Sequence, residues 1–395
     1  MENPFALESG ILEQLYASYV EAVDSYNWHA DPGQDDLWPE IVPISSSQFR
    51  RFVETAFWAS LKQEEGRFHE FSLLVHPLNT YNHRFVFNKP LKFSADHLAK
   101  LAPALDPAAN GILVWPDHEG ELLVRGFAPL GDMGLAATTI APGQIIVSFK
   151  QIGMLHFTAL ISGTRLEFVG VSEFLTWLVP EAKDKRRIDV FREDWQRVRR
   201  AIDYRDIAAD MRAHQHGGAL LMVDPKSDWR ESFSQPITFS GEPYSKVWFD
   251  VAHRDQTIEE LKSEEPLWTV SPRYRAAIDS TRKSLRTIGQ LTAVDGATLI
   301  SYDLEVLAFG AKIKPRGADR PTFALISEPF KDSAATEIPL AALGGTRHQS
   351  AAQFVYDQRN ALAFVASQDG RLSAMRWDLE RSSVAVIRPA EFALL

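Results

Sequence analysis

The chain has 395 residues, of which 45% are hydrophobic and 24% are charged, a globular composition and a length that suits two domains. Its formal net charge of −10 argues against a general binder of nucleic acid or of anionic membranes, although a local cluster of basic groups can still bind a small anion. It contains no cysteine, which excludes disulfides, thiolate catalysis and zinc held by cysteine.

Two amphipathic helices are predicted first, over residues 9–25 and 46–64. The N-terminus shows neither the basic start nor the uninterrupted apolar run of a signal peptide, and no apolar run in the chain approaches the roughly 20 residues of a membrane helix. We therefore expect a cytoplasmic protein without a membrane partner. The second helix, capped by Ser46 or Ser47, carries an apolar stripe formed by Phe49, Val53, Phe57 and Leu61 and widened by Phe52.

Short β-rich segments separated by turn residues follow between residues 70 and 170, with helical stretches near 94–104 and 172–178. Together with the first helices they predict a separate α+β domain over residues 1–180. No cluster in this domain has the spacing of metal ligands or of a nucleophile with its base. The charged segment PEAKDKRR then indicates a linker, which we place at 181–194.

The second predicted domain covers residues 195–395. A long helical pattern ends at Gly217-Gly218, and the buried strand ALLMVD follows. After an irregular segment, the chain reads as helix, hairpin, Gly/Pro-rich loop, helix and hairpin. This order predicts a mixed β-sheet with helices on both faces, so that the fold class of the chain is α/β, of the mixed α+β kind.

The stretch GGTRHQ, residues 344–349, has the pattern of a helix start that meets an anion. Thr346 and Gln349 have the spacing of a capping box, and a helix N-terminus suits phosphate. Gly345 lets the backbone approach a ligand, while Arg347 and His348 place donors where the helix dipole disfavours cations. The alternative is a capped surface helix with solvated polar residues, and the pattern alone leaves both open.

Two Asp-Gly pairs lie at other predicted strand ends. Asp295-Gly296-Ala297 stands between a predicted helix and a buried strand, where a carboxylate can bind Mg²⁺ or Mn²⁺ together with substrate phosphates. Ser367-Gln368-Asp369-Gly370 stands in the last hairpin and offers a second carboxylate. Plain turns are the alternative for both pairs. His214 and His216 are two residues apart and do not share a helix face, so we do not expect them to bind a metal.

These motifs resemble the catalytic domain of the diadenylate cyclases, which carries D-G-A, G-T-R-H-R and a late V-S-x-x-x-G. The corresponding stretches here are DGA at 295–297, GTRHQ at 345–349 and VASQDG at 365–370, and the strand in HGGALLMVD is also similar. The resemblance covers residues 195–395. Gln349 stands where the family has a second Arg, and Ala366 stands where the late motif has its Ser. The N-terminal half is similar to the probable sensor domains that precede this catalytic domain in other bacterial proteins.

The resemblance implies an enzyme that condenses two ATP molecules into cyclic di-AMP with release of pyrophosphate. It implies that Asp295 binds Mg²⁺ or Mn²⁺ and acts in catalysis with Arg347 and His348, and that Asp369 is a second metal-side acid. The substrate-binding residues would be Gly296, Ala297, Gly345, Thr346, Gln349 and Ser367. Two catalytic domains would meet face to face in a homodimer or higher oligomer, with no nucleic acid as partner.

Two alternatives stay open from the sequence. The first is a catalytically weakened protein that binds nucleotide as a sensor, which the Gln349 departure favours because the second guanidinium is lost. The second is a scaffold without a ligand, in which the capping box and the Asp-Gly turns are only structural.

Overall fold

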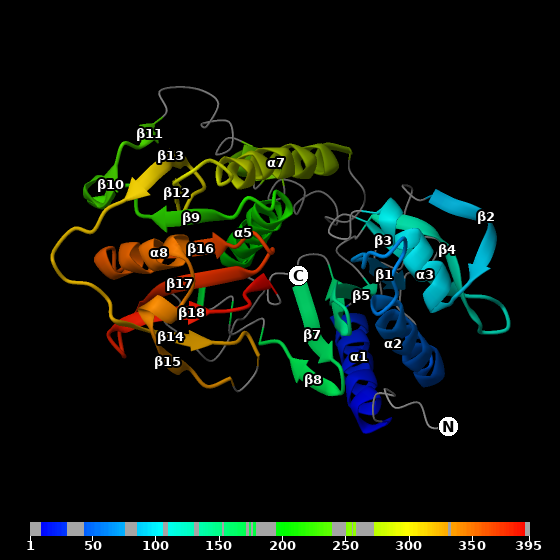
Figure 1. Ribbon diagram of the computed structural model, residues 1–395. Helices are drawn as coiled ribbons and strands as arrows, with labels where there is room; N and C mark the ends of the chain where they lie inside the picture. Colours follow the sequence, from blue (N-terminus) through cyan, green and yellow to red (C-terminus); the bar gives the residue numbers. More distant parts are fainter. Residues whose placement is uncertain are drawn as a thin grey trace. The chain divides into compact units, whose positions relative to one another are not determined.

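The computed structural model describes the following residues (Figure 1): 9–29, 43–75, 85–105, 110–129, 134–151, 154–170, 174, 177–178, 195–238, 250–254, 256–257, 272–330 and 333–391. The chain divides into two compact units, Met1–Val171 and Ser172–Leu395. The predicted linker, 181–194, lies outside the described residues. Of the helices that the structure describes, none is long and apolar enough to cross a membrane.

An eight-stranded sheet forms the first unit, with the strand order β2-β4-β3-β1-β5-β6-β7-β8. Neighbouring strands are antiparallel except β1 and β3, which are parallel. The strands are β1 (Ser72–Val75), β2 (Phe85–Lys92), β3 (Asn110–Pro116), β4 (Leu122–Pro129), β5 (Gly134–Ala141), β6 (Gln144–Gln151), β7 (Met154–Ser162) and β8 (Arg165–Phe168). The helices are α1 (Ser9–His29), α2 (Ser46–Ser60) and α3 (Ala95–Leu101), with the short 3-10 helix η1 (Ala102–Ala104) after α3.

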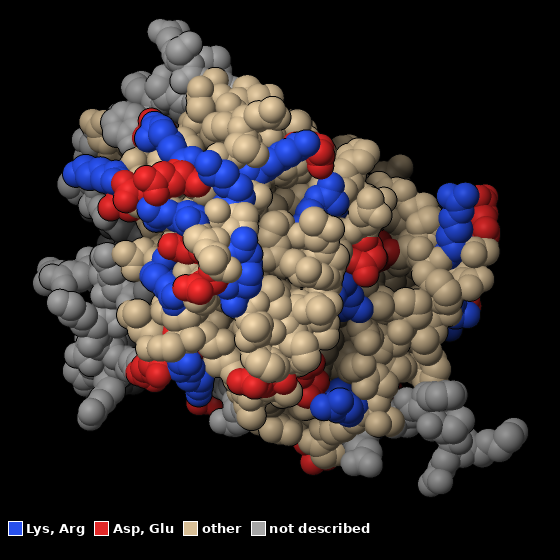
Figure 2. Space-filling view, turned by 60° about the vertical axis from the view of Figure 1, so that its left-hand side comes forward, with Lys and Arg blue, Asp and Glu red and all other residues tan. Residues whose placement is uncertain are grey.

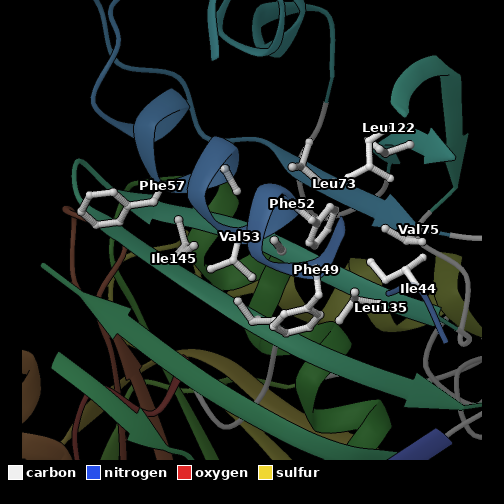
Figure 3. Packing of buried hydrophobic residues seen from close by; sticks show 14 of the residues in the cluster. Ile44, Phe49, Phe52, Val53, Phe57, Leu73, Val75, Leu122, Leu135 and Ile145 are labelled. Atoms are coloured by element: carbon white, nitrogen blue, oxygen red, sulfur yellow. The ribbon is translucent and has the colours of Figure 1, made fainter. Parts of the chain in front are cut away.

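Helix α2 supplies the core of this unit. Its cap is Ser45, one residue before the predicted pair: the Ser45 Oγ accepts from the Gln48 N–H at 3.3 Å, and the Gln48 side chain accepts from the Ser45 N–H at 2.8 Å. The predicted stripe is buried except at its end, where Leu61 follows the last helical residue and is 38% exposed. Figure 3 shows the α2 side chains packed against the sheet, with these residues labelled: Phe49, Phe52, Val53, Phe57, Leu73, Val75, Leu135 and Ile145.

A ten-stranded sheet forms the second unit, with the order β10-β13-β12-β9-β16-β17-β18-β14-β15 and β11 paired to β13. The pairs β9/β12 and β14/β18 are parallel and the others antiparallel. The strands are β9 (Gly218–Val223), β10 (Phe233–Ser234), β11 (Ile237–Thr238), β12 (Ala297–Ser301), β13 (Val306–Ile313), β14 (Phe323–Ser327), β15 (Thr336–Pro339), β16 (Leu362–Ala366), β17 (Leu372–Asp378) and β18 (Ser383–Ile387). The mixed sheet and the mixed α/β class predicted from the sequence are thereby confirmed.

Helices cover both faces of this sheet, because side chains alternate along each strand. On one face, α8 (Thr346–Asp357) packs against Ala219, Leu221 and Val223 of β9. On the other face, Tyr204 of α5 (Trp195–Ala213) lies 6.4 Å, between ring centroids, from Phe364 of β16. Helix α7 (Pro272–Leu291) packs on α5. Two 3-10 helices, η2 (Trp229–Ser232) and η3 (Leu340–Ala342), complete the described elements.

Charged side chains of both signs are intermixed on the face drawn in Figure 2. Blue Lys and Arg side chains lie beside red Asp and Glu side chains over most of the charged area that this view displays. Such a face carries no large single-signed field. Recognition of an anion on this face therefore depends on individual side chains placed by the fold.

Candidate functional site

The parallel strands β9 and β12 of the second sheet begin at the same edge of that sheet, the edge formed by strand ends. Ala297 of β12 lies opposite Ala219 of β9, so the chain enters both strands from the same side. Asp295 therefore precedes β12 at the same edge at which Gly217 precedes β9. Neighbouring strands are about 4.8 Å apart. The fold thus brings the Asp-Gly pair at 295–296 close to the glycine pair at the end of α5.

The turn between β16 and β17 reaches this edge too. Ala366, the last residue of β16, lies opposite Gly218. The end of β18 also lies here, because the Ala390 N–H donates to the Leu372 carbonyl at 2.9 Å. We call the following residues the motif edge: Gly217, Asp295, Gly296, Ser367–Arg371 and Arg388.

The Asp-Gly-Ala stretch combines one exposed acid with two residues that the packing requires. Gly296 has φ +106°, and a Cβ there would lie 2.5 Å from the Gly310 carbonyl carbon, so only glycine fits. Ala297 is buried in the hydrophobic cluster beneath α8, on the core side of β12. Asp295 is exposed. Of the three, Asp295 is the residue whose side chain is free to meet a solute.

Helix α8 begins at Thr346, as predicted, but the predicted capping box is wrong. Gly345 occupies the cap position and no side chain caps the helix. Thr346 is therefore the first helical residue, one position too late to accept from Gln349. The Gln349 side-chain amide instead donates to the Gly344 carbonyl at 2.9 Å, and the N–H groups of His348 and Gln349 both donate to the Gly345 carbonyl.

Arg347 reaches from the helix start to the motif edge. It is half-buried, and its Nη1 lies 3.1 Å from the position that a Gly217 Cβ would take. The Ala366 carbonyl and the Gln368 side chain lie beside the same position, at 3.2 and 3.6 Å. Gly217 therefore leaves the space that the guanidinium uses. The structure brings Arg347 together with the turn that carries Ser367 and Asp369.

His348 points inward, beneath the helix start. It is 6% exposed, a Cβ on Gly344 would lie 3.0 Å from its ring, and its Nε2 is 3.3 Å from the Ser373 Oγ. The pKa of His348 is lowered to about 4, mainly by burial; the charge of Arg388 also lowers it, and that of Asp369 acts in the opposite direction. The imidazole is neutral at pH 7 and supports the chain before α8 from below, away from solvent.

The turn at 367–370 is held tightly. The Asp369 carboxylate accepts from the Ser367 hydroxyl and from the Arg371 N–H at 3.3 Å, and the Ser367 bond is the main cause of the lowered pKa of Asp369. The Gly370 carbonyl accepts from Arg212 Nε of α5 at 2.7 Å. The buried Glu391 accepts from the N–H of Leu372, the first residue of β17, at 2.9 Å.

The two candidate histidines make a local hydrogen-bond network. His214 Nδ1 accepts from the His216 backbone N–H at 3.1 Å, which makes Nε2 the donor toward the Thr292 Oγ1, 3.0 Å away. Both ring nitrogens of His214 are thus engaged. Burial is the main cause of the lowered pKa of His214, with His216 and Arg347 adding to it.

A divalent cation would need the substrate's oxygens here. Within the described part of the chain, no three His, Asp or Glu side chains are grouped to hold a metal ion. Mg²⁺ is commonly bound through one or two carboxylates plus substrate phosphates, and the exposed Asp295 fits that arrangement. Asp369 offers a second carboxylate that already accepts two hydrogen bonds.

Three residues of the site were not predicted from the sequence: Arg212, Arg388 and Glu391. None lies in a motif, and each reaches the motif edge from a distant part of the chain: from the end of α5 or from beyond β18. The sequence has no short-range signal for such contacts. Only the strand order places these residues beside the turn.

Comparison with known families concerns the first unit. Residues 42–129 match the family model for the probable sensor domain DACNV. The stretch therefore contains a probable sensor domain. This confirms the part of the sequence resemblance that concerned the N-terminal half. No curated protein matches the chain.

The DACNV stretch contains α2, α3 and the strands β1 to β4. Helix α2 contacts the turn between β3 and β4 through two side chains: the Gln48 side-chain amide donates to the Gly120 carbonyl at 2.8 Å, and Arg51 forms an ion pair with Glu121. Exposed apolar side chains lie on its edge strand β2, where Phe85 is 79% and Val86 57% exposed. The described part of this stretch thus combines a packed core with two exposed apolar side chains on the edge strand β2.

Proposed function

We propose that the second unit is a diadenylate cyclase, which condenses two ATP molecules into cyclic di-AMP, and that the sensor domain regulates it. The observation that carries the proposal is the convergence of Asp295, Arg347 and the Ser367–Gly370 turn, which come from three distant segments. The DACNV match adds support, since that domain is found in diadenylate cyclase-associated proteins.

The reaction requires positioning and stabilisation of charge. The 3′-hydroxyl oxygen of one ATP attacks the α-phosphorus of the other; the new P–O bond forms as the bond to the β-phosphate oxygen breaks and pyrophosphate leaves. In this proposal Asp295, which is exposed, accepts the hydroxyl proton. Arg347 and the uncapped start of α8 bind the triphosphate. A Mg²⁺ or Mn²⁺ ion held by Asp295 and the phosphates would neutralise charge on the leaving group.

Ring closure requires two sites that face each other. Each motif edge would hold one ATP, and each ATP supplies both an attacking hydroxyl and an α-phosphate. A homodimer or higher oligomer is therefore part of the proposed mechanism. His348, which is buried and neutral, would act by holding the backbone before α8 in place.

The second candidate is a nucleotide-binding sensor without turnover. The observation that favours it is Gln349, whose amide is committed to the Gly344 carbonyl and carries no charge for phosphate. Incubation with ATP and Mn²⁺ separates the candidates. The cyclase releases pyrophosphate and forms cyclic di-AMP; the sensor raises its melting temperature with ATP but releases nothing; a scaffold does neither.

A further inference from the structure

Arg388 lies at the motif edge on the side opposite Arg347. It follows β18, and its backbone N–H donates to the Ser327 carbonyl at 2.9 Å. Its side chain crosses to the chain before α8, where Nη1 donates to the Leu343 carbonyl at 3.0 Å. The residue is half-buried. A guanidinium carries five N–H donors in a planar fork, so this one bond leaves most of its donors for another partner.

Neither Arg347 nor Arg388 has a carboxylate within 4.0 Å among the described residues. Other arginines of the same unit do: Arg371 lies 3.7 Å from Glu391, and Arg381 lies 3.1 Å from Asp378. Half-burial makes an unpaired guanidinium costly, and a helix N-terminus repels cations. His348, whose pKa is affected by the charges of Arg388 and Asp369, adds no charge at pH 7, since its pKa is lowered to about 4.

The two arginines approach the start of α8 from different sides. The guanidinium of Arg347 lies beside Gly217, which precedes β9, whereas Arg388 follows β18. β16 and β17 lie between β9 and β18, so the two strands are about 14 Å apart at three strand spacings. The guanidinium of Arg347 thus lies toward β9, and the side chain of Arg388 comes from the β18 side to the Leu343 carbonyl. A chain of phosphates lying across the helix start can contact both guanidiniums.

We propose that Arg388 binds the polyphosphate chain of an anionic ligand, which Arg347 binds from the other side. The anion supplies the negative charge that the two guanidiniums otherwise lack, and charge-assisted forked bonds give it both affinity and direction. Taking the triphosphate of ATP as the natural source rests on the proposed function. Binding of a polyphosphate as such does not.

The test uses the full chain and inorganic tripolyphosphate as the probe, with binding measured by titration calorimetry. Arg388→Gln keeps a polar side chain and removes the charge. We expect about tenfold weaker binding, the value of one charge-assisted hydrogen bond. Arg381→Gln makes the same change on an exposed, ion-paired arginine of the same unit and should change the affinity less than twofold. Wild-type affinity in Arg388→Gln, or no binding by the wild-type protein, overturns the proposal.

A second measurement needs no variant and covers the case in which Arg388→Gln folds poorly. Phenylglyoxal modification of the wild-type protein, followed by peptide mass analysis, should show Arg388 protected by tripolyphosphate and Arg381 modified equally with and without it. Equal modification of Arg388 overturns the proposal. If tripolyphosphate binding depends on Arg388 but the protein does not convert ATP, this inference holds and the proposed cyclase function is contradicted. If the protein converts ATP but binding does not depend on Arg388, the cyclase function holds and this inference is contradicted.

Discussion

At the scale of single residues, His348 shows how burial decides what a motif histidine can do. Its ring lies against Gly344 and reaches Ser373, and the pKa lowered to about 4 keeps it neutral. A neutral histidine on the inner side of the helix cannot attract phosphate by charge. Its place in the motif is explained by the backbone that it supports.

The pH dependence of stability tests this reading of His348. The folded pKa is lowered, so the unfolded chain binds this proton first as pH falls. The stabilisation is complete above pH 6.5 and is lost as pH falls toward 4, a change on the order of 3 kcal/mol in the free energy of unfolding. Denaturant titrations of His348→Gln should show a shallower decline over this range. The exposed His118→Gln should keep the wild-type profile, and a wild-type profile in His348→Gln would contradict the reading.

Arg347 and Gln349 should respond differently to truncation. Arg347→Ala removes a charged group from the motif edge, and we expect kcat/KM for ATP to fall at least tenfold with little change in melting temperature. Gln349→Ala removes the bond to the Gly344 carbonyl and should mainly cost about 1 kcal/mol of stability. Steady-state kinetics and thermal unfolding of both variants distinguish a loss of turnover from a loss of stability. Equal loss of turnover at unchanged stability would assign Gln349 to the ligand.

At the scale of elements, the start of α8 depends on Gly344. Its φ of +148° is a value that other residues rarely adopt, and an added Cβ would lie 3.0 Å from the His348 ring. Gly345, the next residue, has φ −69° and open space around it. The two glycines of one motif therefore have different roles: the first is required by the backbone, and the second leaves the helix end open.

Alanine substitutions separate these roles. We expect Gly344→Ala to lower the free energy of unfolding by about 1–3 kcal/mol because of backbone strain. Gly345→Ala should lower it by less, about 0.5–1 kcal/mol, because alanine is a poorer N-cap than glycine but adopts this backbone conformation without strain. Denaturant unfolding of both variants measures this directly. A Gly344→Ala protein as stable as Gly345→Ala would mean that the chain before α8 is not fixed as the structure has it.

The sequence predicted those elements whose apolar side chains form a recognisable pattern. It did not predict strands that form because their backbone pairs with neighbouring strands. The α2 stripe and the six buried residues of β9 follow from apolar pattern alone. Seven strands were not predicted: β5, β8, β10, β11, β14, β15 and β18. β5 reads GLAATTIA, whose small residues carry little strand signal, and β8 and β15 have four residues each. Their strand state comes from neighbours distant in the sequence.

The candidate site was predictable in part for the same reason. The motifs gave Asp295, Arg347 and the 367–370 turn, which the strand order brings to one edge. The capping box at Thr346 failed because a glycine took the cap position, a choice that the local sequence allows equally well. Arg388 carries no local pattern, since its partner Leu343 is 45 residues away.

At the scale of the whole molecule, the proposed reaction requires a dimer or higher oligomer. One motif edge binds one ATP, so a monomer lacks the second reacting group. We expect the rate per protomer to fall steeply on dilution, in step with loss of the dimer measured by light scattering. A constant rate per protomer over a range in which the protein is monomeric would contradict the face-to-face mechanism.

The most direct test of the account compares wild-type protein with Asp295→Asn in ATP and Mn²⁺, with products separated by chromatography. Asp295 is exposed, so the substitution should leave the fold and the melting temperature intact. The account predicts cyclic di-AMP from the wild type and from Asp319→Asn, an exposed control in the loop before β14, and none from Asp295→Asn. Wild-type yield from Asp295→Asn would make Asp295 a turn residue and would contradict the proposed chemistry.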